Sequence, residues 1–352
     1  MDNLAHTLVG AALARAVAGS RVARAATAGA VAANAPDWIE LIIGLAPGGA
    51  YLILHRGITH SLAAALVETL ALILVIGWGA RWWIKRRGGR APPWGPLAAA
   101  TAATVYSHLV LDWQGSYGLR PFLPWQATWY YGDWVAIVDP FFWLVPLIAL
   151  AWGQERHWIP LTAVLLAGAL MTFFLGRAAV AGRVALWVLI VFAGLTAVGC
   201  VGWLRYWFGP VARRQAAALA ILLLGLYTGA QGIAAHFRKA EIRQAALARF
   251  DSTARWAALT NPGRPFTWDA IYASDDTIAG DGWQVPRHLD VPVVQRAIRD
   301  TPEGRAMAQF ARFLAADVDS TRRGDGVIVY LRDARYARAG RSGWGIVTVR
   351  MN

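Results

Sequence analysis

Residues 55–79 read HRGITHSLAAALVETLALILVIGWG, and the rest of the chain is arranged around them. Positions 55–61 bring together two histidines, an arginine and two hydroxyl groups. Positions 62–79 follow as an apolar run in which Glu68 is the one charged residue. A bilayer is crossed by roughly 20 apolar residues, and polar groups at its boundary cost free energy unless they are hydrated, paired or bound. The stretch therefore predicts a membrane helix whose first residues form a polar cluster that needs a partner.

The composition of the whole chain agrees with a membrane location. Of its 352 residues 57% are hydrophobic, and the mean hydropathy is +0.39, which excludes an ordinary soluble enzyme and favours a polytopic membrane protein. The 19 tryptophans fit a protein with wide membrane–water interfaces. The net charge of +13 does not indicate a nucleic-acid partner, because most basic residues of the first two thirds lie between apolar segments. With one cysteine, no intramolecular disulfide can form.

Acidic residues divide the chain into two parts. The first 236 residues hold eight Asp and Glu, whereas the last 116 hold thirteen. We therefore expect an all-α polytopic membrane domain at residues 1–236 and a small α+β soluble domain at residues 237–352. The soluble part shows helical patterns near 237–250, 291–299 and 303–316, and strand patterns near 266–273, 282–285, 326–332 and 344–350.

Apolar periodicity places eight helices in the membrane domain. They are expected near residues 4–19, 24–44, 60–80, 96–112, 134–152, 158–176, 184–204 and 214–235. The first two are rich in alanine and weakly hydrophobic, so they could be tilted, half-buried or re-entrant. The number of helices that cross the membrane is therefore predicted to be six to eight.

Arginine and lysine predict the orientation, since they concentrate in cytoplasmic loops. If the loop at residues 81–90 is cytoplasmic, alternation of the helices places twelve basic residues inside and four outside. The inner set is Arg15, Arg21, Arg24, Arg81, Lys85, Arg86, Arg87, Arg90, Arg156, Arg205, Arg213 and Arg214. The outer set is Arg56, Arg120, Arg177 and Arg183. This bias predicts a multi-pass protein of the bacterial inner (plasma) membrane whose carboxyl-terminal domain is extracytoplasmic.

Six residues are candidate metal ligands, and the predicted topology places all of them on the outer side of the membrane. They are His6, Asp37, His55, His60, His108 and Asp112. His108 and Asp112 are four residues apart, which puts both on one face of a helix. Taken alone, that pair is explained equally well by helix capping or core packing. Imidazole and carboxylate are usual zinc donors, and six donors are more than the four that one tetrahedral zinc ion takes. The sequence thus predicts one or two divalent cations, with Zn²⁺ the best candidate.

Two further residues are candidates for catalysis. Asp139, on the same side of the membrane, could be a ligand, a carboxylate that orients a histidine, or a general base. A plain carboxylate at a helix amino terminus explains it equally well. Arg56 could neutralise an anionic substrate or transition state, or contact a headgroup phosphate. The aromatic segment 113–133 is either an interfacial anchor or a wall for an amphiphilic substrate.

Several of these residues form motifs in a recognisable order. Asp2-x-x-x-His6-Thr7 is followed by Pro36-Asp37, then by His55-Arg-Gly-Ile-Thr-His60-Ser61, and then by His108-x-x-x-Asp112. Over roughly residues 1–140 this order resembles the membrane-bound metal-dependent hydrolases of the YdjM type. The resemblance implies that the six candidate ligands form a metal site and that the activity is hydrolysis.

Three functions remain open at this stage. The first is a membrane-embedded hydrolase whose metal-activated water attacks an ester, preferably a phosphoester, of a lipid or lipid-linked substrate at the outer leaflet. The second is a non-enzymatic membrane protein with a structural metal or polar cluster and a partner-binding outer domain. The third is a transporter, which the scarcity of ionisable residues at mid-membrane disfavours. The sequence names no protein partner.

Overall fold

The computed structural model describes residues 1–22, 24–43, 49–152, 158–205, 207, 212–319 and 326–351. It consists of two compact units. The helical unit comprises Met1–Pro36, Ile58–Ile233 and Thr260–Thr267, and the sheet unit comprises Asp37–Gly57, Ala234–Leu259 and Trp268–Asn352.

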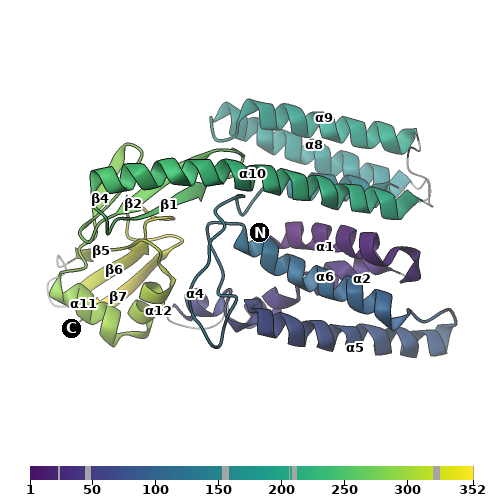
Figure 1. Cartoon of the computed structure of the whole chain (residues 1–352), viewed down its shortest axis with the longest axis horizontal. Helices are drawn as coiled ribbons and strands as arrows, with labels where there is room; N and C mark the ends of the chain where they lie inside the picture. The colour runs from purple at the N-terminus through teal and green to yellow at the C-terminus, as the bar shows by residue number, and fades with distance from the viewer. Residues whose placement is uncertain are drawn as a thin grey trace. The chain divides into compact units, whose positions relative to one another are not determined.

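The helical unit contains most of the α-helices (Figure 1). They are α1 (Asn3–Ala18), α2 (Ala25–Ala32), α5 (Leu62–Arg87), α6 (Trp94–Trp113), α7 (Phe141–Ala151), α8 (Trp158–Val180), α9 (Leu186–Leu204) and the first part of α10 (Arg213–Arg249), with short 3-10 turns η1 (Gly19–Arg21), η2 (Ala35–Ile39, which continues into the sheet unit) and η3 (Ile58–His60). This confirms the prediction that the amino-terminal part is mostly helical.

Side-chain caps fix where the two helices nearest the polar cluster begin. The Asp2 carboxylate accepts a hydrogen bond from the Ala5 amide at the start of α1, and Ser61 accepts one from the Ala64 amide at the start of α5. Each cap satisfies a backbone N–H that has no partner within the helix. The predicted helix start at residue 60 is thus moved to Leu62, and His60 lies in the preceding 3-10 turn.

Helices α1 and α2 pack with their backbones almost in contact. A Cβ added at Gly10 would lie 2.3 Å from the Ala33 Cβ, and one added at Gly29 would lie 2.4 Å from the Ala14 Cβ and from the Gly10 carbonyl oxygen. Such close crossings need small residues, as in many membrane helix pairs. The alanine- and glycine-rich composition of this region therefore serves helix contact.

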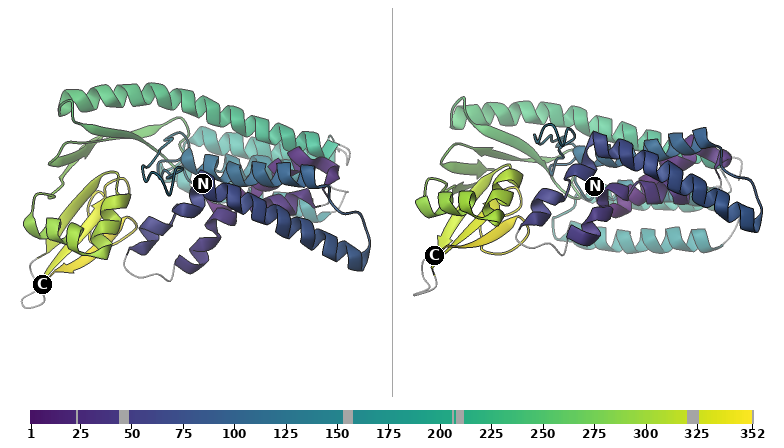
Figure 2. Two further views of the ribbon diagram at one scale, coloured as in Figure 1. Left: turned by 60° about the horizontal axis from the view of Figure 1, so that its bottom comes forward. Right: turned by 90° about the horizontal axis from the view of Figure 1, so that it is seen from below.

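Among the described helices, three are long and apolar enough to cross a membrane: α5, α9 and α10. Much of their apolar surface points outward; Val67 and Leu70 of α5, for example, are 65% and 54% exposed. Large apolar side chains on an outer surface are expected where lipid replaces water. Figure 2 shows α5 and α6 packed side by side.

Two predicted helices are wrong in extent, and proline explains both. The segment 24–44 is helical only to Ala32, then forms the 3-10 turn η2 (Ala35–Ile39) and the short helix α3 (Glu40–Ile43). Pro36 lacks the N–H that a continuing helix needs. The segment 134–152 becomes helical only at Phe141, directly after Pro140, so Asp139 precedes the helix instead of lying within it.

The sheet unit holds two antiparallel sheets, ordered β1-β2-β3-β4 and β5-β6-β7. Their strands are β1 (Arg255–Thr260), β2 (Trp268–Ala273), β3 (Thr277–Gly280), β4 (Trp283–Pro286), β5 (Leu314–Asp319), β6 (Val327–Asp333) and β7 (Ile346–Met351). Helices α11 (Pro292–Asp300) and α12 (Pro302–Phe310) pack on the second sheet (Figure 2). The short helix α4 (Ala50–Leu54) also belongs to this unit and packs on α12. Ile271, Ile278, Phe313 and Ala315 form a core that both sheets share.

The sheet unit confirms the α+β prediction in outline and corrects it in detail. Strands β2, β4, β6 and β7 lie where strand patterns were seen, but β1, β3 and β5 were not predicted. The predicted helix 303–316 ends at Phe310, and Leu314–Asp319 instead pairs with β6 as a strand. The change in acidic composition near residue 236 falls inside α10, which continues without a break to Arg249.

Candidate functional site

The motif at residues 55–61 forms a tight turn between two helices. His55 ends α4, Arg56 has a left-handed backbone with φ of 50°, and the Gly57 amide bonds the Leu54 carbonyl. A Cβ at Gly57 would lie 2.7 Å from that carbonyl oxygen, so glycine is required here. The 3-10 turn η3 then places His60 just before the Ser61 cap. The local chain geometry therefore places His60 directly before the residue that caps the start of α5.

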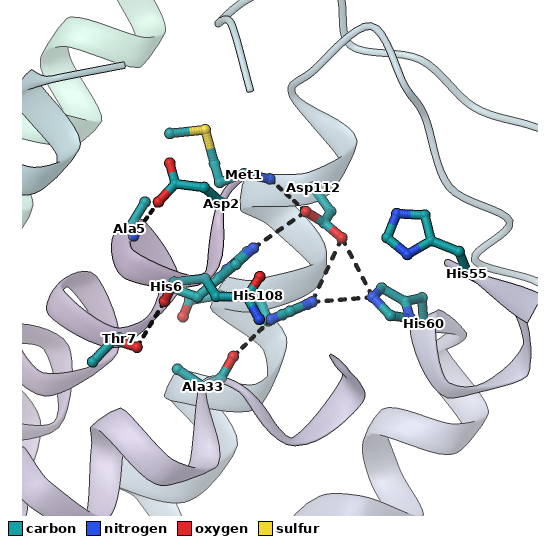
Figure 3. Close-up of polar contacts among 12 residues, drawn as sticks. Met1, Asp2, Ala5, His6, Thr7, Ala33, His55, His60, His108 and Asp112 are labelled. Atoms are coloured by element: carbon teal, nitrogen blue, oxygen red, sulfur yellow. Dashed lines mark hydrogen bonds and ion pairs between the residues drawn. The ribbon is translucent and has the colours of Figure 1, made fainter. Parts of the chain in front are cut away.

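Four of the six candidate ligands converge within the helical unit (Figure 3). His6 comes from the first turn of α1, His60 from η3, and His108 and Asp112 from the last turns of α6. His6, His60 and His108 are fully buried, and Asp112 is 2% exposed. The predicted i, i+4 face of α6 is thus the centre of the cluster.

The Asp112 carboxylate faces all three imidazoles. Its Oδ1 lies 3.3 Å from the His6 Nε2, and its Oδ2 lies 3.4 Å from the His60 Nε2 and 3.5 Å from the His108 Nε2. The His60 and His108 Nε2 atoms are 3.1 Å apart, and the rings of His6 and His108 stack at 3.8 Å. The Met1 amino group also contacts Asp112 Oδ1, at 2.5 Å, and brings a positive charge to this carboxylate.

The partners of the outer ring nitrogens set the tautomers. His108 Nδ1 lies 2.6 Å from the Ala33 carbonyl oxygen, which can only accept, so Nδ1 carries a proton and a neutral His108 presents a lone pair at Nε2. His60 Nδ1 lies 3.1 Å from the Thr59 hydroxyl, which can hold it in the same way. Hydrogen bonding of the second nitrogen to a carbonyl or hydroxyl is how proteins orient metal-binding histidines. The Ala33 carbonyl was missed by sequence reasoning, since a backbone group leaves no residue-type signal.

The spacing of these donors fits a small divalent cation. Ligand atoms about 2.0–2.1 Å from a tetrahedral zinc lie roughly 3.3 Å from one another. The His60 Nε2, the His108 Nε2 and the Asp112 Oδ2 are 3.1 to 3.5 Å apart, and the His6 Nε2 lies 3.3 Å from the other carboxylate oxygen, Oδ1. One ligand atom each from His6, His108 and Asp112 fall within 4.8 Å of one another. Two lone pairs at 3.1 Å repel unless a proton or a cation lies between them. The donor set and its tautomers therefore suit a metal ion.

Asp139 makes its contacts elsewhere in the helical unit. Its Oδ1 accepts from the Phe141 amide at 2.9 Å, and its Oδ2 accepts from the Tyr227 hydroxyl of α10 at 2.7 Å. Burial raises the pKa of Asp139 to about 6, although both hydrogen bonds lower it. These contacts fit the reading of Asp139 as a carboxylate at a helix start. Its role as a base or ligand stays a prediction, and Tyr227 was not foreseen as its partner.

The remaining predicted site residues belong to the sheet unit. His55 pairs through Nδ1 with the Glu40 carboxylate, Arg56 is buried at 2% exposure, and Asp37 is 8% exposed in the turn η2. A non-glycine residue with positive φ, such as Arg56, is uncommon and is enriched at functional sites. Their membership of the metal site stays a prediction.

An apolar cavity in the helical unit is lined in part by sequence neighbours of two cluster residues. Its volume is about 500 Å³, and it is bounded by α1, α6, α7 and α10 together with Trp134. Ser107, Leu111 and Gln114, which adjoin His108 and Asp112 in the chain, line it. A mostly apolar cavity with a few polar groups in its lining is a usual form of a lipid or other small-molecule site.

The aromatic segment after α6 packs onto the same end of the helical unit. The Leu62 amide at the start of α5 bonds the Pro121 carbonyl, and Leu119 pairs with Tyr130. Arg120 is buried with its guanidinium 4.7 Å from the Trp129 ring centroid, and burial lowers its pKa. Residues 260–267 also belong to this unit, where Thr260 contacts Ser116. The wall or lid role for this segment stays a prediction.

Comparison with known proteins agrees with the motifs. The model of the family described as YdjM inner membrane protein matches residues 1–184, which contain the whole buried cluster and confirm the resemblance drawn from the sequence. No curated protein and no solved structure is matched by the chain. Since the match covers more than half of its length, the chain belongs to the YdjM inner membrane protein family.

Proposed function

We propose that this protein is a membrane-embedded metal-dependent hydrolase whose metal is held by His6, His60, His108 and Asp112. The observation that carries the proposal is the convergence of three buried imidazoles on one buried carboxylate, with separations of 3.1–3.5 Å. Burying an ionised carboxylate is costly. The Met1 amino group offsets part of that cost for Asp112, and a dication would offset more of it and keep Asp112 ionised. Asp37, four residues along the chain from the Ala33 carbonyl, is the candidate for a further ligand.

Each residue of the site would have a separate role in hydrolysis. A bound zinc ion supplies Lewis acidity and lowers the pKa of water to about 7. His108 holds its Nε2 lone pair toward the centre through the Ala33 contact, and Thr59 can hold His60 in the same way by accepting a hydrogen bond from its Nδ1. Arg56 is the candidate for neutralising developing negative charge, and Asp139, with its pKa raised to about 6, is the candidate for accepting a proton.

The substrate class follows from the surroundings of the cluster. The cavity of about 500 Å³ is lined mainly by apolar side chains, and α10, one of its walls, is apolar enough to cross a membrane. An alkyl chain would fill such a cavity, and Gln114, one of its few polar lining residues, could contact the ester group. These features support an ester of a lipid or lipid-linked molecule, with a phosphoester favoured because a cationic centre stabilises a developing phosphoryl charge.

A structural metal site is the second candidate, and one observation favours it. The cluster already offers four protein donors, whereas catalytic zinc sites keep one position open for water. A closed site of this kind would tie α1, η3 and α6 together without turnover. Catalysis therefore requires that one of the four donors remain outside the coordination shell, or that the metal accept a fifth ligand.

One set of measurements separates the two candidates. Metal content is measured on the full chain purified in detergent, together with hydrolysis of a fluorescent phosphatidylglycerol in mixed micelles. The variants are His60→Ala and His108→Ala, and the control is His236→Ala, an exposed histidine of α10. We expect about one ion per chain in the wild type, and loss of both metal and turnover in the two site variants alone.

The products and the stability of the variants decide the remaining alternatives. Diacylglycerol or phosphatidic acid would identify phosphoester cleavage, and a free fatty acid would identify carboxylic ester cleavage. Metal loss with lowered stability and no turnover in the wild type would favour the structural site. A metal-free wild type that stays folded, with site variants equally stable, would overturn both candidates.

A further inference from the structure

The end of the helical unit opposite the histidine cluster is strongly basic. Arg15 lies in the last turn of α1, Lys85, Arg86 and Arg87 lie in the last turn of α5, and Arg213 begins α10. No Asp or Glu occurs between residues 13 and 36 or between residues 73 and 104. Neither of these two segments therefore supplies a carboxylate to neutralise its own positive charge.

Several of these arginines are held against tryptophan rings. The guanidinium carbon lies 3.9 Å from the ring centroid for Arg81 over Trp94, and 4.2 Å for Arg86 over Trp82. Arg87 lies 5.0 Å from the ring of Trp83. Tryptophan and arginine together are typical of helix ends at the headgroup layer. This pattern places the end of α5 at a membrane interface.

A cavity of about 460 Å³ opens at this end between α2, α5 and the segment that follows α5. Its lining is mainly apolar: Val22, Thr27, Ala28, Val31, Ile76, Ala80, Trp83, Ile84 and Pro92. Two charged residues complete it, Arg24 just before α2 and Arg90 just after α5. Both are exposed, and in the described part of the chain no carboxylate forms an ion pair with either.

We propose that this cavity binds one anionic phospholipid of the surrounding leaflet. The acyl chain lies among the apolar side chains of α2 and α5, and Arg24 and Arg90 bind the phosphate through charge-assisted hydrogen bonds. Basic pockets between membrane helices bind acidic headgroups in this way. A free phosphate ion would use the two arginines but not the apolar lining, so the lining argues for a lipid. This site is separate from the candidate metal site and does not depend on any hydrolase activity.

The competing explanation is that these arginines only set the orientation of the chain in the membrane. In that case any lipid binding at this end depends on total charge, and it does not depend on the shape of the cavity. Variants that alter charge and shape separately can distinguish the two.

The experiment counts retained lipids on the full chain by native mass spectrometry, after titration with phosphatidylglycerol or phosphatidylcholine of identical acyl chains. The test variants are the double change Arg24→Gln with Arg90→Gln, and the cavity-filling Ala80→Phe. The matched control is Arg177→Gln with Arg183→Gln. It removes the same charge from two exposed positions, one in the last turn of α8 and one in the connection between α8 and α9. Glycerol 1-phosphate in large excess serves as the headgroup without chains.

We expect one phosphatidylglycerol retained with clear preference over phosphatidylcholine. The double Arg24/Arg90 variant should bind it about 30-fold more weakly, since each arginine near an anionic headgroup contributes about 1 kcal/mol. Ala80→Phe should also weaken binding, by at least about tenfold, because it fills space that the chain occupies. The control should change affinity by less than about twofold, because its arginines lie far from the cavity. Equal losses in test and control variants, no effect of Ala80→Phe, or complete displacement by glycerol 1-phosphate would each overturn the proposal.

Discussion

The two ring nitrogens of His108 have different partners. Nδ1 is held 2.6 Å from the Ala33 carbonyl, and Nε2 faces His60 and Asp112. His60 repeats the arrangement with Thr59 on its Nδ1 side. The orientation of both rings therefore depends on groups that do not themselves touch the centre of the cluster.

Thr59 offers the sharpest test of this dependence. Thr59→Val keeps the shape of the side chain but removes the hydroxyl next to His60, so we expect zinc affinity to fall roughly 10- to 100-fold. The measurement is competition with a metal-binding dye on the purified full chain. Thr69→Val is the control, since Thr69 is buried in α5 away from the histidines. Equal affinities in both variants would show that Thr59 does not orient His60.

Asp139 gives the fold a pH dependence of known sign. Its folded-state pKa is raised to about 6 from 3.8, so its contribution to stability is fully present below pH 3.8 and is lost as the pH rises through about 6. The full difference corresponds to about 3 kcal/mol. We expect Asp139→Asn to flatten the fall in stability between about pH 4 and pH 7, measured by unfolding in detergent. A variant as pH-sensitive as the wild type would contradict this assignment.

The sequence predicted those features of the cluster that depend on which side chains are present and how they are spaced along the chain. The i, i+4 spacing of His108 and Asp112 and the position of His6 at the start of a helix were sufficient to bring three residues to one place. It could not predict the Ala33 carbonyl, because every residue carries one. It also could not predict that Asp139 would bond Tyr227, since that contact depends on how α10 packs more than eighty residues later.

At the scale of elements, the crossing of α1 and α2 sets the position of the Ala33 carbonyl. Ala33 caps α2, and the two helices approach so closely that Gly10 and Gly29 leave no room for a Cβ. Any change that separates them should move this carbonyl away from His108.

Two glycine substitutions test this crossing with opposite expected signs. Gly29→Ala places a methyl 2.4 Å from the Ala14 Cβ, so we expect a loss of about 1–3 kcal/mol and weaker metal binding. Gly79→Ala, in the interior of α5 with nothing within 4 Å, should raise stability by up to about 1 kcal/mol through helix propensity. Unfolding and zinc titration of both variants give the comparison. A stabilising Gly29→Ala would show that the helices can separate without cost.

Local sequence patterns predicted helices and strands well wherever the locally favoured structure is also the one that tertiary packing favours. The helices α5, α6 and α9 lie close to their predicted ranges because long apolar runs leave few alternatives. The helical pattern at residues 303–316 extends past the end of α12 at Phe310, because pairing with β6 and burial against Phe313 make Leu314–Asp319 a strand. Such pairing joins distant residues, so no local pattern reveals it.

At the scale of the whole molecule, the charges of the helical unit divide between its ends. Buried histidines and Asp112 gather at the ends where α1 and α5 begin, and basic residues gather where these helices finish. Composition predicted this division and a separate α+β carboxyl-terminal part, since neither depends on side-chain packing. The positive-inside rule then predicts that the basic end is cytoplasmic and that the sheet unit is extracytoplasmic.

Single cysteines test this orientation directly. Cys200 is the one cysteine of the chain, so Cys200→Ser provides a cysteine-free background into which Ser342→Cys or Ser20→Cys is placed. Both serines are exposed, Ser342 in the sheet unit and Ser20 at the basic end beyond α1. In spheroplasts treated with a membrane-impermeant maleimide, we expect labelling of Ser342→Cys at once and of Ser20→Cys only after the membrane is permeabilised. The reverse pattern would place the basic end outside, against the rule that the twelve inner arginines and lysines obey, and would move the histidine cluster to the cytoplasmic leaflet.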